Sequence, residues 1–166
     1  MGLLAALVSA GCGYQFATGA GSMGDVHFVA IETPANDSFD PGIEFTVARA
    51  LRREAMRRGA LRVVEDSDAA DLVLSGRVLP IVTTGTSVSS VVLTLEYEIR
   101  MQVLLEARYR DGRELPIDRL GLAETERYLA SADLEVTRKN REEALRLVAS
   151  AIATRVYDSL AAGLAP

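Results

Sequence analysis

The fold is decided by the stretch Leu93-Thr94-Leu95-Glu96-Tyr97-Glu98-Ile99-Arg100-Met101-Gln102-Val103-Leu104-Leu105-Glu106-Ala107-Arg108-Tyr109. Apolar and polar residues alternate along this stretch, and only Leu104 breaks the alternation. Successive side chains of a strand point to opposite faces of the sheet, so one face here is buried and the other is wet. The pattern predicts a long strand of an antiparallel sheet.

The length of this strand limits how it can be accommodated. At about 3.3 Å per residue it would exceed ~50 Å, whereas a usual strand has about five to six residues. It must therefore bend, bulge or project past the core. Asp111-Gly112 is a strong turn signal directly after it, and residues 120–129 can return as another strand.

Further strands are predicted on the N-terminal side of this stretch. Val26–Ile31 is a β-rich apolar run, and Leu61–Glu65 reads as a short strand. Residues 71–84 mix β-branched residues with Gly76 and Pro80, which favour a bulge or a sheet edge.

A first helix is predicted over residues 42–58, with Gly59 at the C′ position. Its apolar stripe comprises Ile43, Val47, Ala50, Leu51 and Ala55. Four basic residues project from the other side: Arg49, Arg52, Arg53 and Arg57. They form either a solvated face favoured by the helix dipole or a contact for an anion or a partner.

A second helix is predicted to begin at Asn140, because Glu143 three residues later resembles a capping box. The helix ends near Gly163. Its apolar stripe comprises Leu145, Val148, Ala149, Ile152, Val156 and Leu160.

Together these elements have the order β-α-β-β-β-β-α. Two amphipathic helices bury their stripes most simply against one face of a sheet. We therefore predict an α+β fold, an α/β sandwich with a mostly antiparallel sheet of four to five strands. Residues 25–166 are expected to form this single domain.

Composition limits the classes of function. The 166 residues are 49% hydrophobic and 25% charged, as in globular proteins. The formal charge of -5 and the pI of about 5.0 argue against general nucleic-acid binding, which needs a basic surface.

The single cysteine follows an apolar run near the N-terminus. Residues 3–8 are apolar, and Ser9-Ala10-Gly11 lead directly to Cys12. This is the shape of an export signal, too short for a spanning helix. It resembles the lipobox of bacterial lipoproteins, although Ser9 replaces the usual leucine or valine and no Lys or Arg precedes the run. The resemblance implies a signal peptide at residues 1–11 and a lipid on Cys12.

Residues 12–24 are glycine-rich and are predicted to be a flexible tether. Residues 19–24 also match G-x-G-x-x-G, but a dinucleotide-binding turn would need a strand before it and a helix after it. The alternative for Cys12 is a buried or disordered cysteine in a frayed N-terminus.

The residues needed for catalysis are scarce. His27 lies in an apolar run, and Glu96 and Glu98 share the wet face of an alternating strand. With one histidine and one cysteine, zinc ligation by a His/Cys set is excluded, and no phosphate-binding or calcium-binding loop is present. We expect no enzyme activity, no metal site and no cofactor.

Three segments resemble the LptE family of lipopolysaccharide-assembly lipoproteins of Gram-negative outer membranes. They are Cys12-Gly13-Tyr14, Leu95-Glu96-Tyr97-Glu98-Ile99-Arg100-Met101 and Ala153-Thr154-Arg155-Val156-Tyr157-Asp158-Ser159-Leu160. The resemblance implies a lipid-anchored protein on the periplasmic side of the outer membrane. It would plug the β-barrel LptD, help that barrel to fold and contact lipopolysaccharide, with no catalysed reaction.

The resemblance also suggests residues for the lipopolysaccharide contact. Family members use basic residues near the strand tips and before the last helix. Arg138, Lys139 and Arg141 match the second location and are expected to pair with phosphates. Residues 83–90, at the first location, contain no basic residue.

Two other classes of function stay open. The chain could be an envelope accessory lipoprotein or a pilotin for another complex, with no lipid ligand. It could also be a small secreted hydrolase, which would require a cleft where titratable groups converge.

Overall fold

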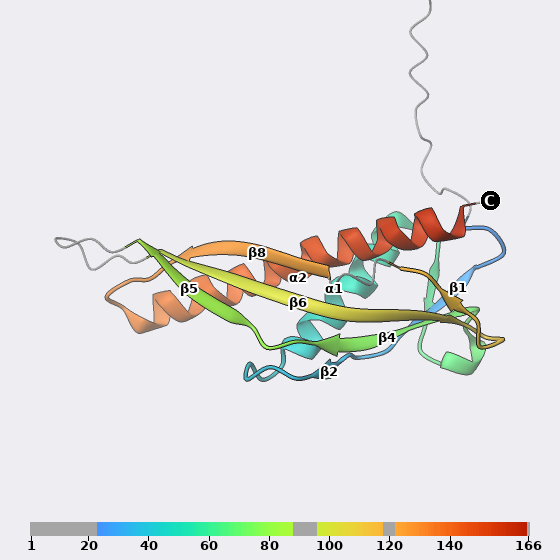
Figure 1. Ribbon diagram of the computed structural model, residues 1–166, viewed down its shortest axis with the longest axis horizontal. Helices are drawn as coiled ribbons and strands as arrows, with labels where there is room; N and C mark the ends of the chain where they lie inside the picture. The colour runs from blue at the N-terminus through green and yellow to red at the C-terminus, as the bar shows by residue number, and fades with distance from the viewer. Residues whose placement is uncertain (1–22, 88–95, 118–121, 166) are drawn as a thin grey trace, which may run out of the picture.

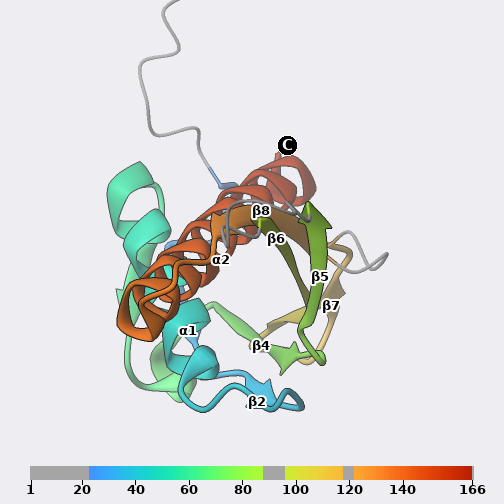
Figure 2. The same ribbon diagram turned by 90° about the vertical axis from the view of Figure 1, so that its left-hand side faces the viewer.

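A computed structural model describes residues 23–87, 96–117 and 122–165. It shows an elongated sandwich in which two helices cover one face of a curved sheet (Figures 1 and 2). The α+β fold predicted from the sequence is confirmed. The strands are β1 (Phe28–Ile31), β2 (Ala35–Asn36), β3 (Arg62–Val64), β4 (Leu72–Val78), β5 (Val82–Ser87), β6 (Glu96–Tyr109), β7 (Glu114–Leu115) and β8 (Leu122–Leu129). The helices are α1 (Ile43–Arg58), the short 3-10 helix η1 (Ser67–Ala69) and α2 (Leu134–Leu164).

Strand β6 is the axis of the sheet. Antiparallel β4 and β5 follow one another along one of its edges, and antiparallel β8 and β7 follow one another along the other. The predicted alternation is confirmed, because Ile99, Met101 and Val103 are fully buried toward the helices while Arg100 is exposed on the opposite face. Leu104, which interrupts the pattern, is 39% exposed.

The expected sheet of four to five strands was wrong in number and in leaving out a parallel part, because the sheet formed by the described residues is mixed and has eight strands. Strand β1 pairs in parallel with β3 on one side and with β4 on the other, and β2 also pairs in parallel with β4. The physical reason is the helix α1, which carries the chain from one end of the sheet to the other between β1 and β3, so that both strands run the same way.

The predicted strand over residues 71–84 is divided into β4 and β5. Pro80, which has no backbone N–H to donate, lies in the break between them. Gly76 marks a close approach rather than a bulge, since a Cβ atom there would lie 2.1 Å from the carbonyl oxygen of Leu104. The register shift occurs later, between Gly85 and Ser87.

Helix α1 follows the sequence prediction closely. All five residues of the predicted stripe are buried. The helix ends at Gly59, whose φ of 71° is left-handed and whose N–H donates to the carbonyl of Ala55. Arg52, on the arginine side, donates to the Ile31 carbonyl at 2.7 Å, which joins α1 to β1.

Helix α2 begins earlier than expected. Its N-cap is Asp133, whose carboxylate accepts a hydrogen bond from the Glu135 N–H at 2.8 Å. The predicted cap at Asn140 was wrong: this residue lies inside the helix and donates its amide to the Leu129 carbonyl of β8. The predicted apolar stripe is nevertheless fully buried.

A single apolar core fills the space between the sheet and both helices. It also includes Met23, at the end of the expected tether, and Val26, both 5% exposed. Gly24 lies so close to the end of α2 that a Cβ there would be 3.2 Å from the Leu164 carbonyl oxygen. The described chain therefore enters the domain beside its own C-terminal end.

Candidate functional site

The domain has two dissimilar ends (Figure 1). We call one the terminal end, where Gly24 lies near Leu164. The other is the tip end, where β5 and β6 leave the sandwich, β8 finishes and α2 begins. At about 1.5 Å per residue, the 31 residues of α2 extend ~46 Å between the ends.

Two tyrosines and an arginine gather at the tip end. The rings of Tyr97 on β6 and Tyr128 on β8 are stacked, with centroids 5.5 Å apart. Tyr128 is 8% exposed, and its burial raises the pKa of the phenol while the neighbouring guanidinium of Arg141 opposes that rise. These contacts hold the ends of two strands against α2.

Arg141 also joins α2 to the loop before α1. Its Nη1 atom lies 2.6 Å from a carboxylate oxygen of Asp40, with side-chain exposures of 32% and 23%. The hydrogen bond to Asp40 raises the pKa of Arg141. The side-chain amide of Asn36 in turn donates to the Asp40 carbonyl at 3.0 Å and to Glu44 at 2.8 Å. Arg141 is thus part of a connected polar network.

The other two residues expected to bind lipopolysaccharide lie two and three residues before Arg141, and all three are inside α2 rather than before it as expected. Arg138 and Lys139 are both exposed. Arg138 forms ion pairs with Glu135 at 2.8 Å and with Glu142, and these carboxylates raise its pKa. An incoming phosphate would therefore have to compete with two carboxylates for Arg138.

Beside the network, a groove of about 500 Å³ separates the start of α1 from α2. Three arginines line it: Arg49, Arg141 and Arg146. Arg141 is paired with Asp40, and Arg146 is paired with Glu143. Arg49 donates to the Phe45 carbonyl at 3.3 Å and to the Thr46 hydroxyl at 3.5 Å, and it has no carboxylate partner among the described residues. Most of the positive charge in the groove is neutralised within the chain.

At the terminal end, Glu54 of α1 binds two arginines. Arg57 donates through Nε and Nη2 at 2.8 and 2.6 Å, and Arg58 through Nε at 2.9 Å. The hydrogen bond from Arg57 lowers the pKa of Glu54 despite the opposing effect of burial. Arg58 also reaches Asp158 on α2 at 2.8 Å and lies 5.1 Å from the ring centroid of Tyr157.

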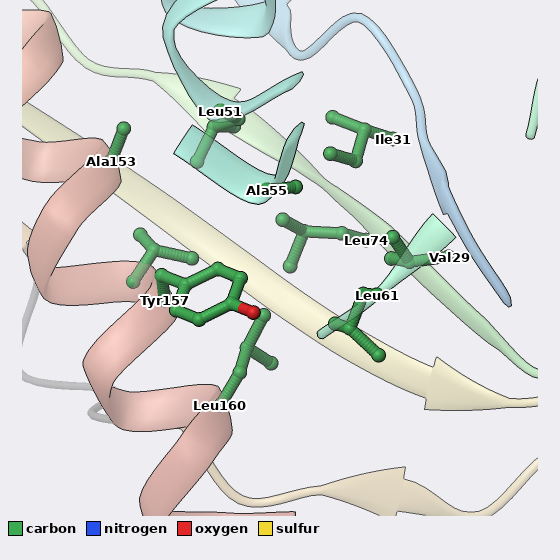
Figure 3. Close-up of a pocket in the computed structure, with 10 residues that line it drawn as sticks. Val29, Ile31, Leu51, Ala55, Leu61, Leu74, Ala153, Tyr157 and Leu160 are labelled. Atoms are coloured by element: carbon green, nitrogen blue, oxygen red, sulfur yellow. The ribbon is translucent and has the colours of Figure 1, made fainter. Parts of the chain in front are cut away.

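The space between the two helices and the sheet is apolar at this end (Figure 3). Tyr157 enters it from α2, with Leu51 of α1 and Leu74 of β4 among the facing side chains. The cavity holds only about 10 Å³, roughly the space that one water needs. Within the described residues, the buried hydroxyl of Tyr157 has no hydrogen-bond partner of normal geometry.

Titratable residues do not form a convergent cleft in the described part of the chain. His27 is exposed, and its backbone N–H donates to Asp71 at 3.0 Å. Glu96 and Glu98 lie on the wet face of β6, at 3.9 and 3.6 Å from Arg127. No group of three or more possible metal ligands occurs among residues 23–87, 96–117 and 122–165, and none of the helices there is long and apolar enough to cross a membrane.

Part of the sequence-based site lies outside the described residues. This applies to Cys12, to the signal peptide and to most of the tether. It also applies to residues 88–90, the last part of the stretch 83–90 that contains no basic residue.

Sequence reasoning missed the partners of Arg141. Tyr128 was placed only in a returning strand, and Asp40 was not singled out. Local sequence patterns do not show which residues meet across the fold.

A protein-family model described as LptE, lipopolysaccharide-assembly, matches residues 26–160. No curated protein matches the sequence at a significant level.

Several solved structures share the fold. Lipoprotein B from Nitrosomonas europaea is 14% identical with a TM-score of 0.54, covering 87% of each chain. A lipoprotein from Caulobacter crescentus is 12% identical with a TM-score of 0.54, covering 80% of this chain and 91% of that one. The minor lipoprotein from Acinetobacter baumannii is 14% identical with a TM-score of 0.50, covering 82% and 94%. At these identities the likeness concerns the fold.

Proposed function

The chain belongs to the LptE lipopolysaccharide-assembly family, and we propose that it is an outer-membrane lipoprotein that plugs the LptD β-barrel, assists the assembly of that barrel and contacts lipopolysaccharide. The family match over nearly the whole folded domain carries this proposal. The lipoproteins that share the fold support it.

The shape of the domain is compatible with such a role. The chain enters at the terminal end, so a lipid on Cys12 would attach the domain there and leave the tip end farthest along the molecule. Helix α2 alone, ~46 Å long, exceeds the ~30 Å hydrocarbon core of a bilayer. Inside a barrel, the tip end of the domain would therefore reach beyond the middle of the membrane.

We assign the lipopolysaccharide contact to Arg138 and Lys139, with Arg141 as a weaker contributor. The first two side chains are exposed near the tip end, where phosphate groups can approach them. Arg141 is half-buried and engaged by Asp40. The proposal includes no catalysed reaction. The contacts described can bind and orient a ligand, but none of them pairs a nucleophile with a base.

The partner can be tested by purifying the full-length protein from Gram-negative envelopes. We expect its intact mass to show cleavage before Cys12 and acylation, and the LptD barrel to co-purify. Cys12→Ser is the matched control, since it changes only the lipidated atom. Recovery of a secretin without the barrel would instead support the pilotin alternative, and an unmodified N-terminus at Met1 would contradict lipid anchoring.

The ligand can be tested with purified lipopolysaccharide at moderate salt. The double variant Arg138→Ala/Lys139→Ala should bind about tenfold more weakly, because two charge-assisted contacts are lost. Arg110→Ala/Arg113→Ala removes equal charge at the terminal end and should bind as the wild type does. Equal affinity of all three proteins would remove Arg138 and Lys139 from the site.

A further inference from the structure

The outer edge of β5 is an open sheet edge. Among the described residues, β5 pairs with β6 alone, and no other strand lies along its second side. Residues 82–86 are all exposed, including Val82 at 55%. A strand in this position presents unpaired backbone N–H and C=O groups to its surroundings.

Other edges of the sheet are protected. Strands β2, β3 and β7 have only two or three residues each. Strand β8 is long, but it carries Glu124, Glu126 and Arg127, and α2 packs along it (Figure 2). Short length and charge are the usual devices that stop an edge from pairing with another chain.

Strand β5 has little of this protection. Its sequence, Val82-Thr83-Thr84-Gly85-Thr86-Ser87, has no charged residue, and β-branched threonines favour extended structure. The register shift between Gly85 and Ser87 interrupts only its last residues. It is therefore the one long edge in the described part of the chain that is suited to accept a further strand.

We propose that the β5 edge binds an extended segment of the barrel partner by β-strand addition, with hydrogen bonds between the two main chains. This inference rests on the proposed function and adds to it the mode of contact. The segment must be a loop or strand outside the barrel wall, because a closed barrel leaves none of its own edges free. Uncharged Thr84 and Val82 would accommodate small or β-branched side chains beside them.

A second copy of the chain is the less suitable occupant. Six residues extend only ~20 Å, and edge pairing of that length buries far less than the about 1,200 Å² typical of a stable interface. A barrel that surrounds the domain supplies the remaining contact area elsewhere. The β5 edge then only has to fix the register of the added segment and the orientation of the domain in the barrel. The rest of the binding affinity comes from the other contacts.

The test measures hydrogen exchange of the β5 amides in the free protein and in the complex with the barrel. We expect exchange over residues 82–87 to slow at least about tenfold in the complex. Thr84→Lys should block the edge and weaken barrel retention about five- to tenfold. Thr125→Lys is the matched control, because Thr125 is also exposed and lies on the same sheet face across β6. It should retain the barrel normally.

The outcomes separate this inference from the proposal on which it rests. A barrel that co-purifies while β5 exchange is unchanged, or Thr84→Lys and Thr125→Lys proteins that retain it equally, would overturn strand addition but leave the partner intact. Failure of the wild type to bind the barrel would overturn both. Concentration-dependent protection of β5 in the free protein would assign the edge to a second copy instead.

Discussion

The two ends of the helix pair use similar residues in different surroundings. At the tip end, Arg141 of α2 pairs with Asp40 beside the buried Tyr128. At the terminal end, Arg58 of α1 pairs with Asp158 over the ring of Tyr157. The first pair is half-buried on both sides, whereas the Asp158 side chain is 57% exposed.

This difference indicates how firmly each end is held. Exposed ion pairs contribute about 0 to 1 kcal/mol, while the loss of one partner from a buried pair leaves an uncompensated charge. The Arg141–Asp40 pair should therefore contribute more to the tip end than the exposed Arg58–Asp158 pair contributes to the terminal end. Between the two ends, α1 and α2 pack through apolar side chains. This apolar middle is a third region whose contribution to stability can be compared with the two ends.

The largest effect is expected in the apolar middle. Ile152 is fully buried, so Ile152→Ala should lower the free energy of unfolding by about 2–5 kcal/mol through lost contacts and a cavity. Leu147→Ala, at a position 41% exposed on the same helix, is the control and should cost about 0.5 kcal/mol. Urea denaturation measures both. Similar costs would mean that the middle does not dominate the helix packing.

Next come the two ion pairs. Arg141→Ala should destabilise the domain by about 1–3 kcal/mol, because Asp40 and Tyr128 lose their cationic neighbour in a half-buried site. Arg58→Ala should cost about 1 kcal/mol or less, because its partner Asp158 is exposed and the buried Glu54 keeps its second arginine, Arg57. Urea denaturation of the two variants under one condition compares them. A larger loss for Arg58→Ala would reverse the ranking of the ends.

Acid should weaken the terminal end through Glu54. Its pKa is lowered from the ordinary value of 4.5 by Arg57 and Arg58, so its contribution is complete above that value and is lost as the pH falls through the lower folded-state pKa. At pH 7, Glu54→Gln should cost about 1 kcal/mol. The gap between wild type and variant should narrow below pH 4.5. A gap that stays constant to pH 3 would contradict this assignment.

The smallest effect is expected from removing one hydroxyl. Tyr157→Phe deletes a buried oxygen that makes no hydrogen bond of normal geometry within the described residues, so stability should stay within about 0.5 kcal/mol or rise slightly. Tyr128→Phe removes a hydroxyl beside Arg141 and should be destabilising by about 1 kcal/mol. Thermal unfolding of the two variants gives the comparison. Equal losses would show that the Tyr157 hydroxyl does have a partner in solution.

Much of the fold was predictable because one face of each long element is buried. The alternation in β6 and the stripe of α1 each identify an element, and Gly59 marks where α1 ends. The same principle explains the error at α2. Its first two turns are mostly exposed and have no apolar stripe, so periodicity begins to detect the helix only near Ala144.

The parallel pairing of β1 did leave a signal that was not used. Val29, Ala30 and Ile31 are three consecutive buried residues, as in strands covered on both faces, and the next long element after a loop is a helix. Such a strand and crossover favour a parallel neighbour. The Arg141–Asp40 pair left no comparable signal, because its residues are 101 positions apart and meet only when the whole sandwich has formed.

The pairing of β6 has a mechanical consequence. On one edge the hydrogen-bonded partners change from β4 to β5 opposite Met101 and Gln102, where β8 continues unbroken on the other edge. The gap between β8 and β7 falls opposite Leu104 to Glu106, where β4 continues. The joints are staggered, so at every position between Glu96 and Tyr109 at least one edge of β6 stays paired, and we expect the sheet to resist bending between the tip end and the terminal end.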